Sequence, residues 1–266
     1  MANKEALQKL LMLKRQQLDP AKFGIARRRG GRGRTLVAGL TQGEACAVLG
    51  WSEGTYGKVE RGDLELTAPR FEELARLFEF TEEDWRNGWS YSFGGEPPYP
   101  LHPQTAYIVV PHWIKVLGAM GVPGYISCPG WNILATNPGF QALFLPGDEP
   151  SNMMRWMILD PRARELYLGD WAASWATAAL PQLRAAVARH PDNETLQKLE
   201  HDVLLDEEAG PLYRSCPDSL DTPDGHTRPF RHPVLGWTQV TLCAAMPQVS
   251  PGQLLMCLLF DTGAGA

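Results

Sequence analysis

The chain has 266 residues and a net charge of −5, a length that suits two domains, each with a core of its own. The charge is divided unevenly, because residues 1–34 hold ten Lys or Arg and only two Asp or Glu, while the rest is acidic. The longest apolar runs, such as 254–260, have only the length of a strand, so we expect a cytoplasmic protein with neither a signal peptide nor a membrane partner.

The N-terminal segment begins with a helical pattern and then becomes basic. Leu7, Leu10 and Leu11 recur at helical spacing, which predicts a helix over 4–17. Residues 27–34 are rich in arginine and glycine. They are either a solvated loop or a flexible arm along phosphates or in a minor groove, and the two helices that follow favour the arm. The candidate phosphate-binding residues of this arm are Arg27, Arg28, Arg29, Arg32 and Arg34.

Residues 40–62 have the pattern of two short helices joined by a tight turn. Thr41 and Glu44 have the spacing of a capping box, and the apolar residues after them fall on one helical face. Gly50 supplies the positive φ that the turn needs, and Ser52 is predicted to cap the second helix. Two short helices with such a turn form a helix-turn-helix, whose second helix enters the DNA major groove. The alternative is an ordinary helical hairpin in an unrelated core.

With its Leu-Thr-Gln start and its Val-Glu-Arg-Gly end, this stretch resembles the helix-turn-helix of XRE-type and phage-repressor proteins. The resemblance implies that Gln42 contacts phosphate and that Glu53, Gly54 and Lys58 face base edges. Glu53 can accept a hydrogen bond from cytosine N4, and Lys58 can donate to guanine or to phosphate. We therefore expect double-stranded operator DNA as the partner. The other candidates for backbone or base contacts are Thr41, Ser52, Thr55 and Arg61.

Two more helices are predicted after the helix-turn-helix, over 69–80 and 81–89, the second with a Thr-x-x-Asp cap. Residues 90–104 hold a pair of glycines and several prolines, which predicts a semi-stiff linker. We therefore expect an all-α DNA-binding domain over 1–89 and a second domain over 105–266.

The second domain has the pattern of a strand pair, a run of helices and three further strands. The strand pair surrounds a Pro-Gly turn at 129–130, and the last three segments also have strand-like composition. Between them the periodicity is helical. This order predicts one antiparallel sheet with helices on one face, which is an α+β fold. The predicted strands are 125–127, 131–136, 227–231, 236–245 and 253–260, and the predicted helices are 112–121, 137–144, 151–159, 161–168, 171–190, 193–204 and 206–214.

Short motifs follow one another through this domain. They are Gly-Tyr-Ile at 124–126 with Trp-Asn-Ile-Leu-Ala-Thr-Asn at 131–137, Asp-Pro at 160–161 with Arg164 and Tyr167, Asp-Trp at 170–171, Arg-His-Pro-Asp at 189–192, Phe-Arg-His-Pro at 230–233 with Gly236, and Ser-Pro-Gly-Gln at 250–253. In this order they resemble the effector domain of MmyB-like transcription regulators, although residues 213–217 depart from the family pattern. The resemblance implies a PAS-like domain that takes a small, largely apolar, fatty-acid-like ligand and needs no cofactor.

Large aromatic and methionine side chains are frequent in the second domain. Such side chains adapt to apolar ligands, but they also serve to pack helices onto a sheet. Both interpretations remain open for each residue, with Trp156, Met157 and Trp175 favoured as ligand contacts because their helices are expected to cover the sheet. The candidate ligand-binding residues are Tyr125, Trp131, Ile133, Phe140, Phe144, Met153, Trp156, Met157, Trp171 and Trp175.

Patterns of catalytic or metal-binding residues are missing from the sequence. The histidines are dispersed without His-x-x-x-His spacing, and the five cysteines stand far apart without a Cys-x-x-Cys pair. There is also no Gly-x-Ser-x-Gly motif and no phosphate loop. We therefore expect reduced thiols, no metal site and no catalytic residues.

Three classes of function fit these observations. The first is a sequence-specific, ligand-responsive transcription regulator that binds symmetric half-sites as a homodimer. The second is a DNA-binding adaptor whose C-terminal domain serves only dimerisation or docking of a partner protein. The third, an enzyme fused to a DNA-binding domain, has the least support.

Overall fold

The computed structural model describes residues 3–26, 39–217 and 224–261. The chain forms two compact units, Met1–Pro103 and Gln104–Ala266, which we call the N-terminal and C-terminal units. Each has a hydrophobic core made of its own residues.

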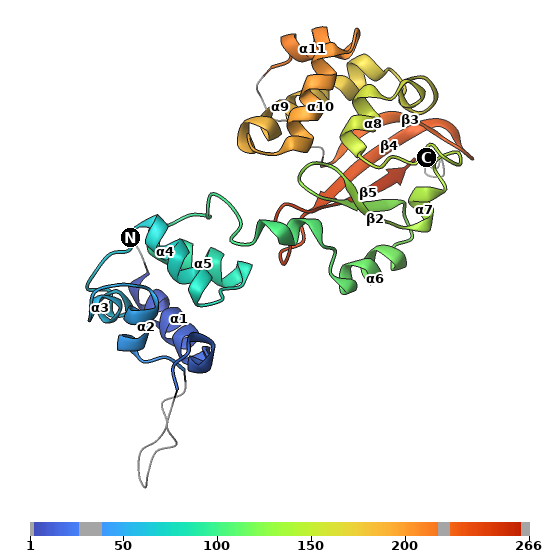
Figure 1. Ribbon diagram of the computed structural model, residues 1–266. Helices are drawn as coiled ribbons and strands as arrows, with labels where there is room; N and C mark the ends of the chain where they lie inside the picture. The colour runs from blue at the N-terminus through green and yellow to red at the C-terminus, as the bar shows by residue number, and fades with distance from the viewer. Residues whose placement is uncertain (1–2, 27–38, 218–223, 262–266) are drawn as a thin grey trace. The chain divides into compact units, whose positions relative to one another are not determined.

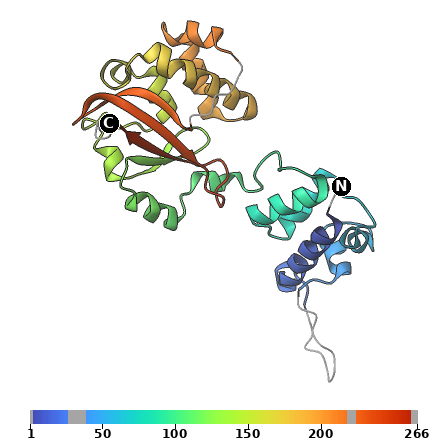
Figure 2. The same cartoon turned by 180° about the vertical axis from the view of Figure 1, so that it is seen from behind.

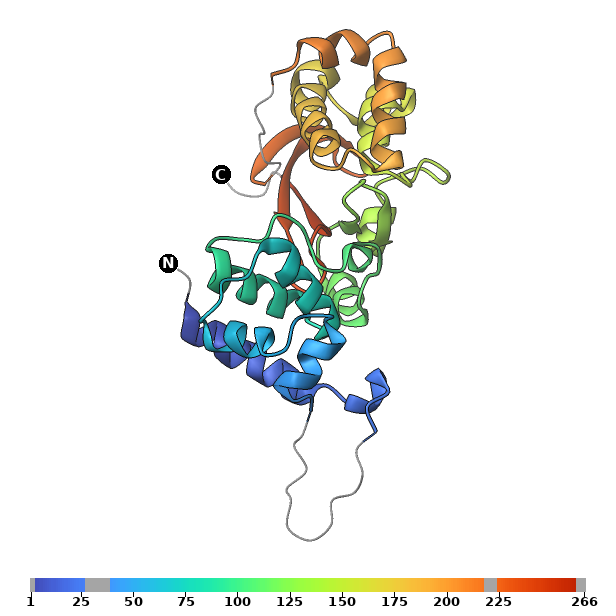
Figure 3. The same ribbon diagram turned by 60° about the vertical axis from the view of Figure 1, so that its left-hand side comes forward.

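The N-terminal unit is a small bundle of helices (Figure 3). Its core is built around Leu11, Tyr56, Phe71 and Trp85, which have no exposed surface. The predicted helices are all present. They are α1 (Lys4–Gln17), α2 (Gln42–Val48), α3 (Thr55–Arg61), α4 (Ala68–Leu77) and α5 (Glu82–Phe93), and a 3₁₀ turn, η1 (Pro20–Phe23), follows α1.

The predicted caps and turn of the helix-turn-helix are confirmed except at the start of α3. The Thr41 side chain accepts from the Glu44 N–H, and the Glu44 carboxylate accepts from the Thr41 N–H at 2.7 Å. Ser52, however, provides no side-chain cap, and α3 begins at Thr55. Gly54 is the N-cap instead, with a φ of +78°, because glycine enters the left-handed region without strain.

The segment that follows α5 folds back onto the N-terminal unit. Helix α5 continues to Phe93, so residues 90–93 of the predicted linker are helical. Further along, Leu101 is completely buried in the N-terminal core. The Trp85 indole N–H donates to the Tyr99 carbonyl at 2.9 Å, and the Glu82 carboxylate accepts from the Leu101 and His102 N–H groups. Most of the Pro-rich segment is therefore a structural part of this unit.

The C-terminal unit has helices and strands close to the predicted positions. It starts with the 3₁₀ turn η2 (Pro103–Tyr107) and α6 (Pro111–Ala119), followed by β1 (Gly124–Ser127), β2 (Ile133–Thr136) and α7 (Pro138–Gln141). The helical region then comprises α8 (Met153–Leu159), the π-helical turns η3 (Ala163–Tyr167) and η4 (Trp171–Ala176), α9 (Thr177–Arg189), α10 (Glu194–Leu205) and α11 (Ala209–Ser215). Strands β3 (His226–His232), β4 (Gly236–Ala245) and β5 (Leu254–Phe260) complete it.

The five strands form one antiparallel sheet in the order β2-β1-β5-β4-β3. Strand β5 comes last in the sequence but lies in the middle, with Met256 opposite Tyr125 of β1 and Leu258 opposite Leu242 of β4. Figure 2 shows β3, β4 and β5 side by side. This arrangement confirms the α+β fold with an antiparallel, PAS-like sheet.

The sheet has helices on both faces, so the prediction of helices on one face was wrong. Helices α8–α11 lie on one side and α6 on the other (Figure 1). Tyr125 and Met256 face the first layer, while their neighbours Ile126 and Leu255 pack against Leu117 of α6. Alternate residues of a strand point to opposite faces of the sheet. Because helices cover both faces here, the side chains on both faces are apolar.

Candidate functional site

The exposed side of α3 and of the turn before it carries most of the DNA-contacting residues predicted outside the arginine arm. Tyr56 and Val59 are buried in the core, which fixes the opposite side of the helix toward solvent. Thr55 is half-buried. The exposed predicted residues are Ser52, Glu53, Gly54, Lys58 and Arg61. Arg61 also forms an exposed ion pair with Asp63 at 2.9 Å.

A buried ion pair holds α3 against α1. Arg15 donates from Nε and Nη2 to the two oxygens of Glu60 at 2.8 and 3.0 Å, and Nη1 donates to the Leu40 carbonyl. Arg15 and Glu60 are only 8% and 5% exposed. Burial pushes the pKa of Glu60 upward, but hydrogen bonds from Arg15 and Gln42 outweigh it and hold this pKa below its usual range. This pair was not predicted from the sequence, although Glu60 belongs to the Val-Glu-Arg-Gly motif.

Gln42 takes part in the same network. Its amide Nε2 donates to Glu60 Oε1 at 2.8 Å, and the side chain is half-buried. Gly57 makes this approach possible, because a Cβ there would lie 2.9 Å from the Gln42 Oε1. Thr41 is likewise engaged in its capping box. Gln42 and Thr41 therefore orient the two helices whatever contact they make with phosphate.

The predicted arm falls outside the described residues. Arg27, Arg28, Arg29, Arg32 and Arg34 all belong to residues 27–38. Their role remains the prediction made from the sequence.

In the C-terminal unit, an apolar cavity lies between the sheet and the layer of α8 and α9. It encloses about 60 Å³, which is far less than the roughly 300–1,000 Å³ of a typical ligand pocket. A ligand larger than a few water molecules must therefore move the side chains of the wall. The cavity is lined by eight of the predicted residues, namely Tyr125, Trp131, Phe140, Phe144, Met153, Trp156, Met157 and Trp175.

Trp171 and Ile133 are the two predicted residues that do not line the cavity. The Trp171 indole N–H donates to the Met157 carbonyl at 2.7 Å, and the Arg164 guanidinium lies 4.1 Å from the centre of its ring. Arg164 in turn pairs with Asp206 at 2.9 Å, so Trp171 joins helices together. Ile133 is half-buried and packs at the edge of the core.

The polar residues of the cavity and the residues of its floor were not predicted from the sequence. Arg228 of β3 and Gln182 of α9 line it among apolar neighbours. Arg228 donates to the Ser174 carbonyl and to His226 Nδ1 and lies over the Trp175 ring. The alternation in β3, β4 and β5 could have indicated the floor residues, which are Phe230, Leu242, Leu254, Met256 and Leu258.

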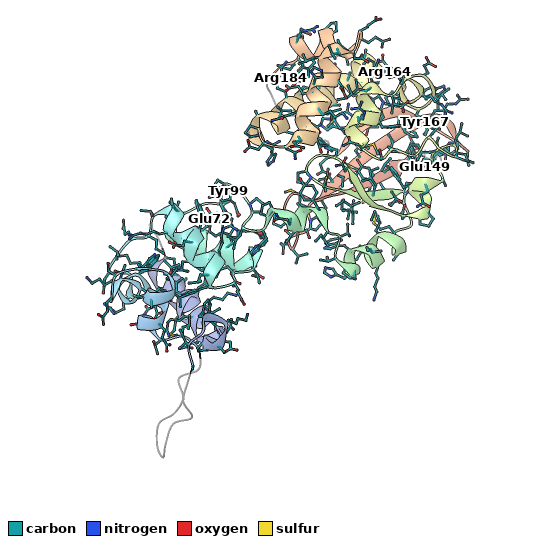
Figure 4. The ribbon with its side chains drawn as sticks, viewed as in Figure 1. Glu72, Tyr99, Glu149, Arg164, Tyr167 and Arg184 are labelled. Carbon is teal, nitrogen blue, oxygen red and sulfur yellow. The ribbon has the colours of Figure 1, made fainter. Side chains whose placement is uncertain are left out.

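The stretch 213–217, which departs from the family pattern, packs on α9. Arg184 donates to the Cys216 carbonyl at 2.7 Å, and its guanidinium lies 4.8 Å from the centre of the Tyr213 ring. Burial, together with the hydrogen bond to Glu200, raises the pKa of the Tyr213 hydroxyl. Figure 4 labels Arg184 and Arg164 in the helical layer. Both arginines tie this layer together without lining the cavity.

Within the part of the chain that the structure describes, no three His, Cys, Asp or Glu side chains gather in a way that could bind a metal ion. Over the same residues, no helix has both the length and the apolar character required to cross a membrane.

Two family models match the chain. The model of the MmyB-like transcription regulator ligand binding domain matches residues 109–264, and a helix-turn-helix domain model matches residues 23–87. No curated protein matches the chain. The first match covers the whole cavity, and the second covers the surface of α3.

Proposed function

Since the chain belongs to the MmyB-like transcription regulators, we propose that its C-terminal unit senses a small apolar ligand, which changes the affinity of a homodimer for operator DNA. The matches to the two family models account for the helix-turn-helix domain and the ligand-binding domain. The apolar, fatty-acid-like nature of the ligand, the residues that bind it and the homodimer are our proposal.

The observation that carries the proposal is the composition of the cavity wall. Apart from Gln182 and Arg228, the lining side chains are aliphatic, aromatic or methionine. Trp156, Met157 and Trp175 belong to helices that cover the sheet. Methionine side chains adapt to the shape of a bound molecule, so Met153 and Met157 are suited to let the small cavity expand.

Expansion of the cavity would change the conformation of the helical layer. A ligand alters DNA affinity only if it binds two conformations of the protein unequally. A ligand that enters beside Trp156 and Trp175 must displace side chains of α8 or α9, because the cavity of about 60 Å³ is too small to hold it. We propose that this displacement changes the dimer contact and, with it, the spacing of the two α3 helices.

In the N-terminal unit, we propose that Lys58 and Glu53 contact base edges, while Arg61, Gln42 and the arginine arm bind phosphates. Both side chains are exposed, Glu53 just before the start of α3 and Lys58 in the middle of the helix. A helix N-terminus is the part of a recognition helix that reaches the bases.

The test compares DNA affinity before and after removal of the bound ligand. The purified protein is analysed by native mass spectrometry for a co-purified small molecule and then delipidated on a hydrophobic resin. We expect a bound apolar molecule and a changed affinity for the operator after its removal. A chain truncated after Pro103, which retains the buried Leu101, should bind DNA without responding. An unchanged affinity of the full chain would contradict the proposal.

The alternative is an adaptor whose C-terminal unit only dimerises or docks a partner protein. It is favoured by the apolar side chains exposed on and before α6, which include Ile108, Ile114 and Val116. In that case, delipidation should leave DNA affinity unchanged, and substitution of Ile114 by Asp should change the oligomeric state or partner binding.

A further inference from the structure

Two free cysteines lie opposite each other on neighbouring strands of the sheet. Cys243 of β4 is the direct partner of Cys257 of β5, and both side chains are half-buried. Directly opposite residues of an antiparallel pair point to the same face, with Cβ atoms about 4.5–5.5 Å apart. Their neighbours Leu242 and Leu258 line the cavity. Because side chains alternate along a strand, the two cysteines lie on the other face, where Cys257 packs with residues of α6.

The two thiols influence each other. Burial raises the pKa of the Cys257 thiol, and the neighbouring Cys243 raises this pKa further. Two thiolates at this separation repel each other, so the pair favours the protonated form. A cation between the two sulfur atoms removes the repulsion, and thiolate sulfur prefers soft metal ions.

A third sulfur atom lies next to this pair. Gly124 of β1 is directly opposite Cys257 on the side away from Cys243, so β1 places no side chain there. Met120, at the end of α6, occupies this space, because its Cε methyl lies 3.2 Å from the position that a Cβ of Gly124 would take. Met120 and Cys257 also belong to the same apolar cluster. Two thiols and one thioether are thus neighbours on this face of the sheet.

We propose that Cys243, Cys257 and Met120 bind one Cu(I) ion. Thiolate and thioether ligands select Cu(I), whereas structural zinc almost always takes four ligands. Among the described residues, no cluster of three His, Cys, Asp or Glu side chains offers such a zinc site. Two metal–sulfur bonds of about 2.3 Å each join sulfur atoms up to about 4.6 Å apart, which suits directly opposite cysteines.

On binding, each thiol releases its proton to solvent and its sulfur forms a bond to the ion, and no atom changes its oxidation state. The spacing of the cysteines in the sequence predicted no metal site, because the pair forms only when β4 and β5 lie side by side (Figure 2). The proposal is independent of the apolar ligand, since the cavity lies on the opposite face of the sheet.

The test uses the full-length chain, kept reduced under nitrogen, and Cu(I) supplied as its complex with the chromogenic chelator bicinchoninate. We expect the wild type to take one equivalent of Cu(I) from the chelator, and an equal concentration of Zn(II) not to displace it. Cys243→Ser and Cys257→Ser should each lose this equivalent, and Met120→Leu should keep it with weaker affinity. Cys216→Ser is the matched control. Cys216 is also half-buried, but its thiol lies against the Tyr213 carbonyl, so this variant should bind as the wild type does.

A second measurement needs no substitution and therefore holds even if a serine variant is unstable. Iodoacetamide alkylation of the wild type is followed by peptide mass spectrometry with and without Cu(I). The ion should protect Cys243 and Cys257 together and leave the alkylation of Cys216 unchanged. The inference is wrong if the wild type takes no Cu(I) from the chelator, if both serine variants bind it as tightly as the wild type, or if the ion does not protect the pair.

Discussion

The Tyr99 hydroxyl donates a hydrogen bond of 2.6 Å to Glu72 Oε2 and so holds the Pro-rich segment on helix α4 (Figure 4). The hydrogen bonds that Glu72 receives from Tyr99 and Arg76 keep the pKa of its carboxyl below the usual range. Tyr99 also stacks on Trp85, and Leu101 fills the core beyond it. The N-terminal unit consequently needs residues as far as 101 for a complete core.

Leu101→Ala should destabilise the N-terminal unit by about 2–5 kcal/mol, because it leaves a cavity in a fully buried position. Denaturant unfolding of the chain truncated after Pro103 measures this change. Leu64→Ala is the matched control, since Leu64 is 39% exposed and its truncation should cost much less. Equal effects of the two substitutions would show that the segment is not part of the folded unit.

Glu60→Gln should weaken the N-terminal unit at neutral pH and remove much of its sensitivity to acid. The pKa of Glu60 is lower in the folded chain than its usual value. Its ionised form therefore contributes stability above about pH 4.3, which is lost as the pH falls through the folded-state pKa. Breaking a buried ion pair from one side costs about 3–5 kcal/mol.

Unfolding of the truncated chain at pH 7 and pH 3 measures both effects. Glu79→Gln is the control, because Glu79 pairs with Lys22 where both side chains are more than half exposed. Such pairs contribute only about 0–1 kcal/mol. A Glu60→Gln variant as stable and as acid-sensitive as the wild type would contradict the role of the pair.

Replacing Arg27, Arg28, Arg29, Arg32 and Arg34 by Ala should weaken binding to all DNA sequences. The salt dependence should become shallower by about 0.9 in log–log slope for each phosphate that the arm no longer neutralises, because fewer counterions are released. Titrations against operator and unrelated DNA at several salt concentrations measure this. A change in sequence preference without a change of slope would assign the arm to base reading.

Lys58→Ala and Glu53→Ala should change which operator sequences are preferred, by about 1–3 kcal/mol for each good base contact. Both side chains are exposed at the surface of the helix-turn-helix. Selection from a random DNA pool compares the preferred sites of each variant with those of the wild type. The control is Lys9→Ala, an exposed lysine of α1 that pairs with Glu5, which should keep the wild-type preference.

Trp156→Phe and Trp156→Ala should leave DNA binding intact and reduce the change in DNA affinity that delipidation causes, more strongly for Ala. Trp156 lines the cavity, and its ring meets Phe144 edge-on at 5.4 Å. Trp237→Ala is the matched control, because this tryptophan is 57% exposed on β4 and does not line the cavity. If the Trp237 variant loses the response as fully as Trp156→Ala, the cavity is not the sensor.

The sequence by itself determined the elements whose signals are local. Thr41 with Glu44 and Thr81 with Asp84 begin α2 and α5 as predicted, because a capping box involves only one helical turn. The aromatic and methionine residues that line the cavity were also found largely from composition. The motifs of the second domain, taken in order, identified its family, and the order of its strand and helix patterns predicted its antiparallel sheet.

Only the tertiary structure decided the contacts between residues far apart in the chain. Arg15 and Glu60 are 45 residues apart, and no periodicity links them. Leu101 was assigned to a linker because prolines surround it. It is buried because its segment folds back and is hydrogen-bonded to α4 and α5. Likewise, Ser127 and Leu254 lie opposite each other because β5 inserts next to β1. Such pairings are set by the packing of whole elements, which short sequence windows do not contain.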